Sequence, residues 1–371
     1  MKVSFPHMGN LYIPLASAIR SLGGEVIIPP YNCKKTLSLG TRNSAEAVCL
    51  PYKLILGNYI QAIEMGADAI LMIDSPGICR LGQYSSSSRM ALVDLNYDVE
   101  FINFDLYKGK LKEIYNGFKR ATGNGNPFDL IKSINLALIK IDILDKLDHA
   151  AAYYRPREIN EGSTNINYNK GIREIEQAMS AAECKNAINK ALKLLSSVPI
   201  DKDKDVVHID ITGEIYVVLD YFSNLEIEKE LGRLGVHVHR KLNLSDWTKS
   251  FLWPSFLRFA ETHGEMAERH AKRYLRRDIG GDALESIGDA AIAGNNNHDG
   301  VVHLLPFTCM PEIMSQNIMP NVRNETDIPV LSLVLDEQMG KAGYVTRLEA
   351  FVDLIKRRKR RNNDSLIKVA S

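Results

Sequence analysis

The feature that most constrains this chain is an alternation of short apolar runs with longer helical patterns. The run Ala69–Asp74 is apolar up to its last residue and lies between turn residues, as in a strand buried on both faces of a parallel sheet. Further strand candidates are Lys2–Pro6, Glu25–Ile28, Val99–Phe104, Val206–Ile211, Ile215–Leu219, Val236–His239, Val301–Phe307 and Val330–Leu335. Strands that alternate with helices predict an α/β fold built on open parallel sheets.

The length of the chain predicts more than one domain. Its 371 residues exceed the size at which a single hydrophobic core usually stops growing. We expect an N-terminal α/β domain in residues 1–128, a helical connecting region in 129–200, a second α/β domain in 201–345, and a C-terminal helix with a basic tail in 346–371. Helices are predicted at Leu11–Leu22, Ser44–Met65 with a break near Pro51, Leu225–Leu234, Gly264–Arg277, Asp282–Ala293 and Thr346–Arg360, with a frayed end after Arg360. The connecting region should break at Asn160–Asn169, where polar residues interrupt its helical pattern.

The charge balance and the apolar runs exclude several classes of protein. The chain has 46 basic and 45 acidic residues, whereas a dedicated nucleic-acid binder usually carries a clear basic excess. No uninterrupted apolar run reaches the roughly 18 residues that span a bilayer, and the first residues do not read as a signal peptide. We therefore expect a cytoplasmic protein with no nucleic-acid and no membrane partner.

Five cysteines are the residues most open to a chemical role: Cys33, Cys49, Cys79, Cys184 and Cys309. An odd number in a cytoplasmic protein argues against a disulfide framework. Cys79 and Cys309 each follow a predicted strand, and Cys49 lies downstream of the second strand, so all three are candidates for the carboxyl ends of the strands, where open α/β sheets bind ligands.

Three thiolates distributed in this way suit an iron–sulfur cluster shared between domains. A structural zinc site would more naturally show C-x-x-C pairs, which the sequence lacks. Spacing alone leaves the alternative that the thiols are small buried hydrophobic groups.

The residues around these cysteines carry a resemblance to a known family. The motifs are Pro29-Pro30, Ser44–Lys53, Leu56–Asn58, Gly77–Tyr84, Thr212–Glu214, Pro306–Glu312, Asp336-Glu337 and Thr346–Phe351. Together they resemble the 2-hydroxyacyl-CoA dehydratase component superfamily, and within it the activase-related, double-cubane-like branch. The resemblance spans nearly the whole chain, and the combination of motifs is more specific than any one of them.

This resemblance implies a fold, a cofactor and partners. It implies two flavodoxin-like domains with a [4Fe-4S] cluster at their interface, held by Cys49, Cys79 and Cys309. Cys33 and Cys184 do not match ligand positions, and a double cubane needs more cysteines than this chain offers, so one cluster per chain is expected. An ATP-hydrolysing activator protein would supply electrons to reduce or reductively dehydrate a small molecule such as an acyl-CoA, in a homodimer or heterodimer.

Four charged residues within these motifs are candidates for supporting roles. Arg80 and Lys53 would stabilise an anionic cluster, and the alternative is that both are ordinary surface charges. Glu312 would be a catalytic proton donor or a fourth ligand, whereas Pro311-Glu312 is equally typical of the first turn of a helix. Glu214 is a second catalytic candidate that would line the cleft between the domains, or it only shapes a turn.

Histidines offer a separate and less complete metal-binding pattern. His237 and His239 lie two residues apart in a predicted strand, so both rings should face the same side. The sequence shows no evident third ligand, and strand histidines usually face solvent or a satisfied core. His298 and His303 precede Cys309 and are further candidates for the edge that carries it.

Two alternatives to an enzyme remain open at the level of sequence. The same cluster would also serve a non-catalytic electron carrier or assembly component of a larger complex. A metal-free binding protein that keeps the scaffold is the third hypothesis.

Overall fold

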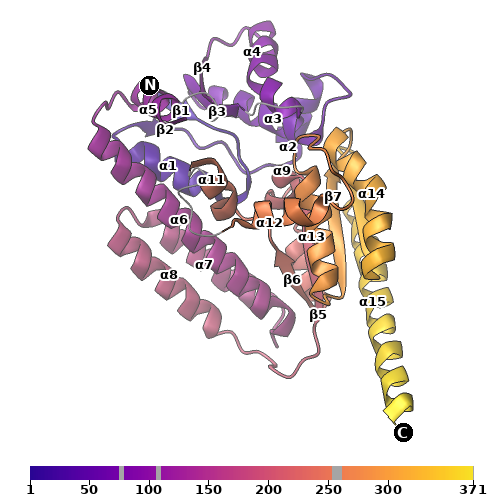
Figure 1. Cartoon of the computed structure of the whole chain (residues 1–371). Coiled ribbons are helices and arrows are strands. Elements are labelled where there is room, and N and C mark those ends of the chain that lie inside the picture. Colours follow the sequence, from indigo (N-terminus) through magenta and orange to yellow (C-terminus); the bar gives the residue numbers. More distant parts are fainter. Residues whose placement is uncertain (75–78, 106–109, 253–260, 371) are drawn as a thin grey trace.

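Two parallel sheets of four strands each organise the chain (Figure 1). The computed structural model describes residues 1–74, 79–105, 110–252 and 261–370, so residues 75–78 of the loop before Cys79 lie outside the described part. The first sheet has the order β2-β1-β3-β4, with β1 (Lys2–Ser4), β2 (Glu25–Val26), β3 (Ala69–Asp74) and β4 (Glu100–Asp105). The second has the order β6-β5-β7-β8, with β5 (Val207–Gly213), β6 (Val236–Arg240), β7 (Gly300–Pro306) and β8 (Val330–Leu335). The prediction of an α/β fold with open parallel sheets is confirmed.

Both sheets have the same strand order relative to the chain. In each, the first strand lies between the second and the third, and the fourth strand pairs with the third. The order therefore reverses beside β1 in one sheet and beside β5 in the other, and such switch points are where open α/β sheets bind ligands. Cys79 follows β3 and Cys309 follows β7, so these two cysteines occupy equivalent positions in the two halves.

The helices of the first half surround its sheet. They are η1 (Gly9–Leu11), α1 (Tyr12–Ser21), α2 (Lys34–Arg42), α3 (Leu50–Glu64), η2 (Arg80–Gln83), α4 (Tyr84–Asp94) and α5 (Lys110–Thr122). The helix expected from Ser44 starts only at Leu50, because Pro51 is favourable in a first helical turn and unfavourable inside a helix. This start places Cys49 directly before α3.

A helical region lies between the two sheets in the chain. It consists of α6 (Pro127–Tyr154), η3 (Arg155–Arg157), α7 (Ser163–Gln177) and α8 (Ala181–Ser196). Asn126 caps α6 by accepting a hydrogen bond from the amide of Phe128 at 3.0 Å. The break between α6 and α7 lies a few residues before the predicted one, because the polar residues after Ser163 are part of α7, where Asn169 and Lys170 are exposed.

The second half departs from prediction in several elements, among them helices at Leu244–Leu252 and Met310–Thr326 that the sequence pattern did not predict. Its helices are α9 (Ile215–Leu219), α10 (Ile227–Arg233), α11 (Leu244–Leu252), α12 (His263–Ala271), α13 (Ala283–Asn295), α14 (Met310–Thr326) and α15 (Lys341–Ala370). The strand predicted at Ile215–Leu219 is wrong, because these residues form α9. All five are buried, so the sequence is apolar at every position and has no periodicity that would distinguish a strand from a helix. The C-terminal helix starts at Lys341 and continues to Ala370, through the segment expected to fray, and its C-terminal end projects past the second sheet (Figure 1).

The two halves meet where the strands of both sheets end. Asn32, which follows β2, donates hydrogen bonds to the Tyr216 hydroxyl at 2.9 Å and to Asp220 at 2.8 Å, both beyond β5. Gly9, which follows β1, packs so closely that a Cβ there would lie 2.4 Å from the carbonyl oxygen of Leu219. One hydrophobic cluster also contains residues of α3 from the first half and of β5 and β6 from the second. The carboxyl ends of both sheets therefore face a common region of the molecule. Among the described residues, no helix has the combined length and hydropathy of a bilayer-crossing segment.

Candidate functional site

The three motif cysteines share one structural position: each is the residue directly before a helix. Cys49 precedes α3, Cys79 precedes the short helix η2, and Cys309 precedes α14. Free amides and the helix dipole give the N-termini of α3 and α14 partial positive charge, which favours bound anions. The local fold therefore places Cys49 and Cys309 at the positive end of a helix.

Arg80 ties the three cysteine segments together. It follows Cys79 directly and donates through Nη1 to the carbonyl oxygen of Ala47, two residues before Cys49, at 2.9 Å. Through Nη2 it donates to the carbonyl oxygen of Thr308, the neighbour of Cys309, and to the Thr308 hydroxyl at 3.3 Å. Thr308 has a φ of 65°, which is rare for a β-branched residue and turns its carbonyl into this contact. Segments from both halves thus converge on one guanidinium group.

The thiols of all three cysteines have raised pKa values. Burial is the main cause, since Cys49 and Cys309 are each 8% exposed, and the Glu214 carboxylate adds to it at all three. The pKa of Cys79 rises to about 11, and Cys49 contributes to the rise at both Cys79 and Cys309, as expected of sulfurs in one electrostatic neighbourhood. Because of these raised pKa values, the thiols stay protonated at neutral pH when no cation is bound. Each thiol would have to lose its proton to bind iron or to react as a nucleophile.

Tyr84 is a site residue to which the sequence assigned no role. Its hydroxyl lies 2.6 Å from the sulfur of Cys49, and its ring packs edge-on against Tyr52. Burial, followed by the charge of Cys49, raises the pKa of this phenol well above its ordinary value. Tyr84 closes the Gly77–Tyr84 motif, and that position was the signal available in the sequence.

Two carboxyl groups near the thiols have pKa values close to neutrality. Burial raises the pKa of Glu214 to about 8, and the negative charges of Asp282 and Glu312 add to the shift. Burial and Glu312 raise the pKa of Asp282 to about 7. Glu214 also accepts a hydrogen bond from the amide of Val217 at 3.1 Å, so it begins α9 and faces the thiols at the same time. Asp282 is a second site residue that the sequence did not reveal.

Glu312 is buried rather than exposed in the first turn of α14. Its Oε2 lies 2.6 Å from Nε2 of His303 on β7, and both residues are 0% exposed. The other ring nitrogen of His303 lies 3.2 Å from the hydroxyl of Ser332. Oε1 of Glu312 is buried without a hydrogen-bond partner among the described residues. Glu312 therefore lies in the first turn of a helix, as Pro311-Glu312 indicated, and it is also a buried carboxyl group with a free oxygen near Cys309.

Lys53 is also not the surface charge that the sequence allowed. It is 1% exposed, and its ammonium group donates to the carbonyl oxygen of Glu46 at 3.1 Å and to Glu337 at 2.8 Å. Although burial raises the pKa of Glu337, the bond from Lys53 lowers it below its ordinary value. Glu337 follows β8, so the pair joins α3 of the first half to the carboxyl edge of the second sheet.

The remaining two cysteines lie in other surroundings. Cys33 precedes α2 and contacts Thr36, while Cys184 is fully buried in the core of the helical region. The ligands of a single metal ion lie close together. Among the described residues, the sulfurs of Cys49, Cys79 and Cys309 do not form a group in which all three lie within 4.8 Å of one another.

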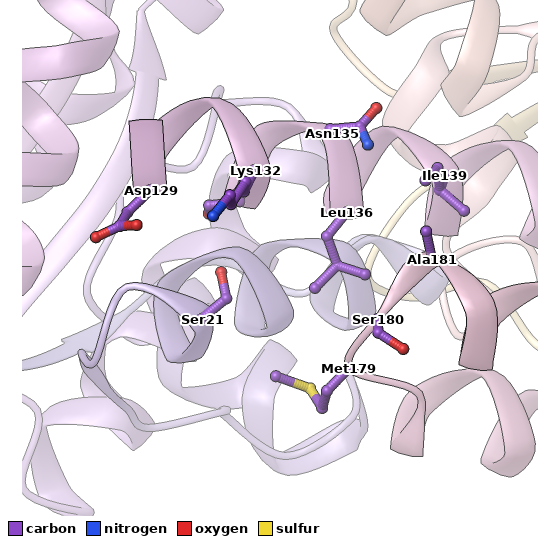
Figure 2. Close-up of a pocket in the computed structure, with 10 residues that line it drawn as sticks. Ser21, Asp129, Lys132, Asn135, Leu136, Ile139, Met179, Ser180 and Ala181 are labelled. Atoms are coloured by element: carbon purple, nitrogen blue, oxygen red, sulfur yellow. The ribbon is translucent and has the colours of Figure 1, made fainter. Parts of the chain in front are cut away.

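A cavity of about 330 Å³ lies in another part of the molecule, between α1, α6 and the start of α8 (Figure 2). It is lined by Ser21, Asp129, Lys132, Ser133, Asn135, Leu136, Ile139, Met179, Ser180 and Ala181. None of the residues around the cysteines lines it. This cavity is therefore separate from the candidate site.

Comparison of the chain with protein-family models and with curated proteins found no match. The assignment of a function therefore depends on the chemistry of the site and on the motif resemblance described above.

Proposed function

We propose that this chain is an iron–sulfur redox protein of the 2-hydroxyacyl-CoA dehydratase type. Cys49, Cys79 and Cys309 would hold a [4Fe-4S] cluster between two flavodoxin-like domains, and an ATP-dependent activator would supply low-potential electrons. The observation that carries the proposal is the convergence of three cysteine segments, from both halves of the chain, on Arg80.

The charges around the thiols suit such a cluster. The helix starts at α3 and α14 and the guanidinium of Arg80 place positive charge beside three thiolates. Glu214, with a pKa of about 8, is mostly protonated at neutral pH and adds little negative charge to oppose them. When bound, the cluster would supply electrons and, at the iron that no cysteine holds, a Lewis acid.

Glu214 and Glu312 would handle the proton that dehydration requires. A hydroxyl group that leaves a substrate must be protonated to become water, and a carboxyl group with a pKa near 8 holds a proton until it is needed. Glu312 contacts His303, so the buried pair would hold or return a second proton. The substrate would be a small hydroxylated molecule such as an acyl-CoA.

An exposed apolar surface beside Cys309 is where we place the activator. Phe307 is 55% exposed, Met310 46%, Ile313 40% and Met314 42%, and all four flank Cys309 in sequence. Flexible methionines suit a surface that binds a partner transiently, and an electron donor has to approach the cluster closely. A second copy of the chain is the other occupant to test, by its oligomeric state in solution.

One observation favours an electron carrier as the second candidate function. Cys49 and Cys309 are each only 8% exposed, which leaves a substrate little access to their sulfurs. A carrier needs only a short path to its partners, whereas an enzyme needs an iron that a small molecule reaches.

The first experiment asks whether the chain holds a cluster. Anaerobically purified or reconstituted protein should contain iron and acid-labile sulfide in equal amounts and give an electron paramagnetic resonance signal on reduction. Cys79→Ser should lose most of the iron, whereas Cys33→Ser should keep it. Cys33 is a matched control because it also precedes a helix, where serine is a favoured residue. Folded wild-type protein without iron, or equal iron in the two variants, would contradict the proposal.

A second measurement separates the enzyme from the carrier. Cyanide or another small ligand added to the reduced protein should change the resonance signal if one iron is open to substrates. An unchanged signal would favour the electron carrier.

A further inference from the structure

Three histidines from neighbouring strands of the second sheet form a separate cluster. His208 lies on β5, and His237 and His239 lie on β6, where His208 is paired in register with His237. One ring nitrogen from each lies within 4.8 Å of the other two, and Nδ1 of His208 lies 2.9 Å from Nε2 of His239. Among the described residues, no other group of three His, Cys, Asp or Glu side chains meets this distance.

The cluster has partners that would orient it. The ring of His298 stacks on His239 with centroids 4.4 Å apart, and Nδ1 of His298 contacts the carboxylate of Asp210 on the same face of β5. Histidine ligands in metal sites are held by neighbouring carboxylates and carbonyls in this way. The cluster lies near the start of β5, whereas Glu214 and the cysteine site lie beyond its end.

Two features of the rings resemble an unfilled ligand set. Nδ1 of His237 is buried without a hydrogen-bond partner among the described residues, although an imidazole nitrogen in the interior normally has one. All three side chains are only partly buried, so an ion from solvent has a route to them.

We propose that His208, His237 and His239 bind a divalent transition-metal ion of the zinc type. Three imidazoles suit Zn²⁺, with Co²⁺, Ni²⁺ and Cu²⁺ as chemical relatives, and leave a fourth position for water or for His298. This site is independent of the iron–sulfur proposal, because it uses other residues, another metal and the opposite end of the sheet.

Titration of tag-free, chelator-treated protein with Zn²⁺ tests the site. Wild-type protein should bind about one equivalent of Zn²⁺ at this site. His239→Gln should bind Zn²⁺ at least about tenfold more weakly, since one ligand of three is lost. His270→Gln is the matched control, because His270 lies on α12 and contacts the carbonyl oxygen of Met266 in its own helix. Bound Co²⁺ should give a spectrum without the charge-transfer absorption of thiolate ligands.

Two outcomes would overturn the site. They are equal Zn²⁺ affinity in wild-type and His239→Gln proteins, or no Zn²⁺ binding by the wild type. Circular dichroism checks that the variants fold, and His208→Gln should repeat the loss seen with His239→Gln. Zn²⁺ should also raise the Tm of the wild type and not that of His239→Gln, because a ligand stabilises only the state that binds it.

Discussion

At the scale of single residues, the site is defined by carboxyl groups that the fold keeps protonated. Glu214 has a pKa of about 8, mainly from burial and then from the charge of Asp282. When the pKa of an acid is higher in the folded protein than in the unfolded chain, the free energy of unfolding falls as the pH rises, because the unfolded chain gives up the proton first. The loss extends from the ordinary glutamate pKa near 4.3 up to about 8.

Glu214→Gln should remove this pH dependence. The amide mimics the protonated acid and can still accept the hydrogen bond from Val217, so the variant should be more stable than the wild type at pH 8, by on the order of 1–3 kcal/mol. At pH 5 the two proteins should have nearly the same Tm. Thermal melts at both pH values measure this difference, and Glu64→Gln, at an exposed position on α3, is the control. A variant that is less stable than the wild type at pH 8 would contradict the assignment.

At the scale of elements, glycines set how closely α2 and α3 cross. A Cβ at Gly40 would lie 1.6 Å from the carbonyl oxygen of Lys53, and one at Gly57 would lie 2.0 Å from that of Thr36. Neither carbonyl can move without shifting its helix. Because Cys49 lies directly before α3, this crossing also places the first cysteine of the site.

Gly40→Ala should therefore destabilise the protein and disturb the site together. We expect a loss of at least 1–3 kcal/mol, the usual cost of forcing extra volume into a packed contact. Urea denaturation measures the loss, and a lower iron content after reconstitution would report the shift of Cys49. Gly343→Ala is the control, since a Cβ there meets nothing within 4 Å and alanine favours the helix. Equal effects of the two substitutions would show that the crossing tolerates a methyl group.

The elements also show what the sequence could and could not predict. The alternation of apolar runs predicted the parallel sheets, because fully buried strands are apolar throughout and turn residues bound them. The same reasoning failed at Ile215–Leu219, where a short buried helix is equally apolar. His237 and His239 were predicted to share a face, and their ring centroids lie 4.5 Å apart. Their partner His208 came from another strand, and only the pairing of β5 with β6 brings it near.

At the scale of the whole molecule, two sheets of the same topology meet at their carboxyl edges. Cys79 and Cys309 come from equivalent loops, and Arg80 connects them across the boundary between the halves. Neither half alone supplies the three cysteines. Any chemistry at this site therefore depends on the two halves keeping their relative position.

The ion pair between Lys53 and Glu337 is the contact that we expect to hold this position. Lys53→Met should destabilise the protein by about 1–3 kcal/mol, because it leaves the partly buried carboxylate of Glu337 without its partner. Lys53→Met with Glu337→Leu should recover part of that loss, with a coupling free energy of about 0.5–3 kcal/mol in a double-mutant cycle. Lys190→Met breaks an ion pair with Glu174 whose side chains are 67% and 40% exposed, and it should cost less than about 1 kcal/mol. If Lys53→Met costs no more than Lys190→Met, the pair does not hold the halves together, and contacts such as those of Asn32 with Tyr216 and Asp220 would be sufficient.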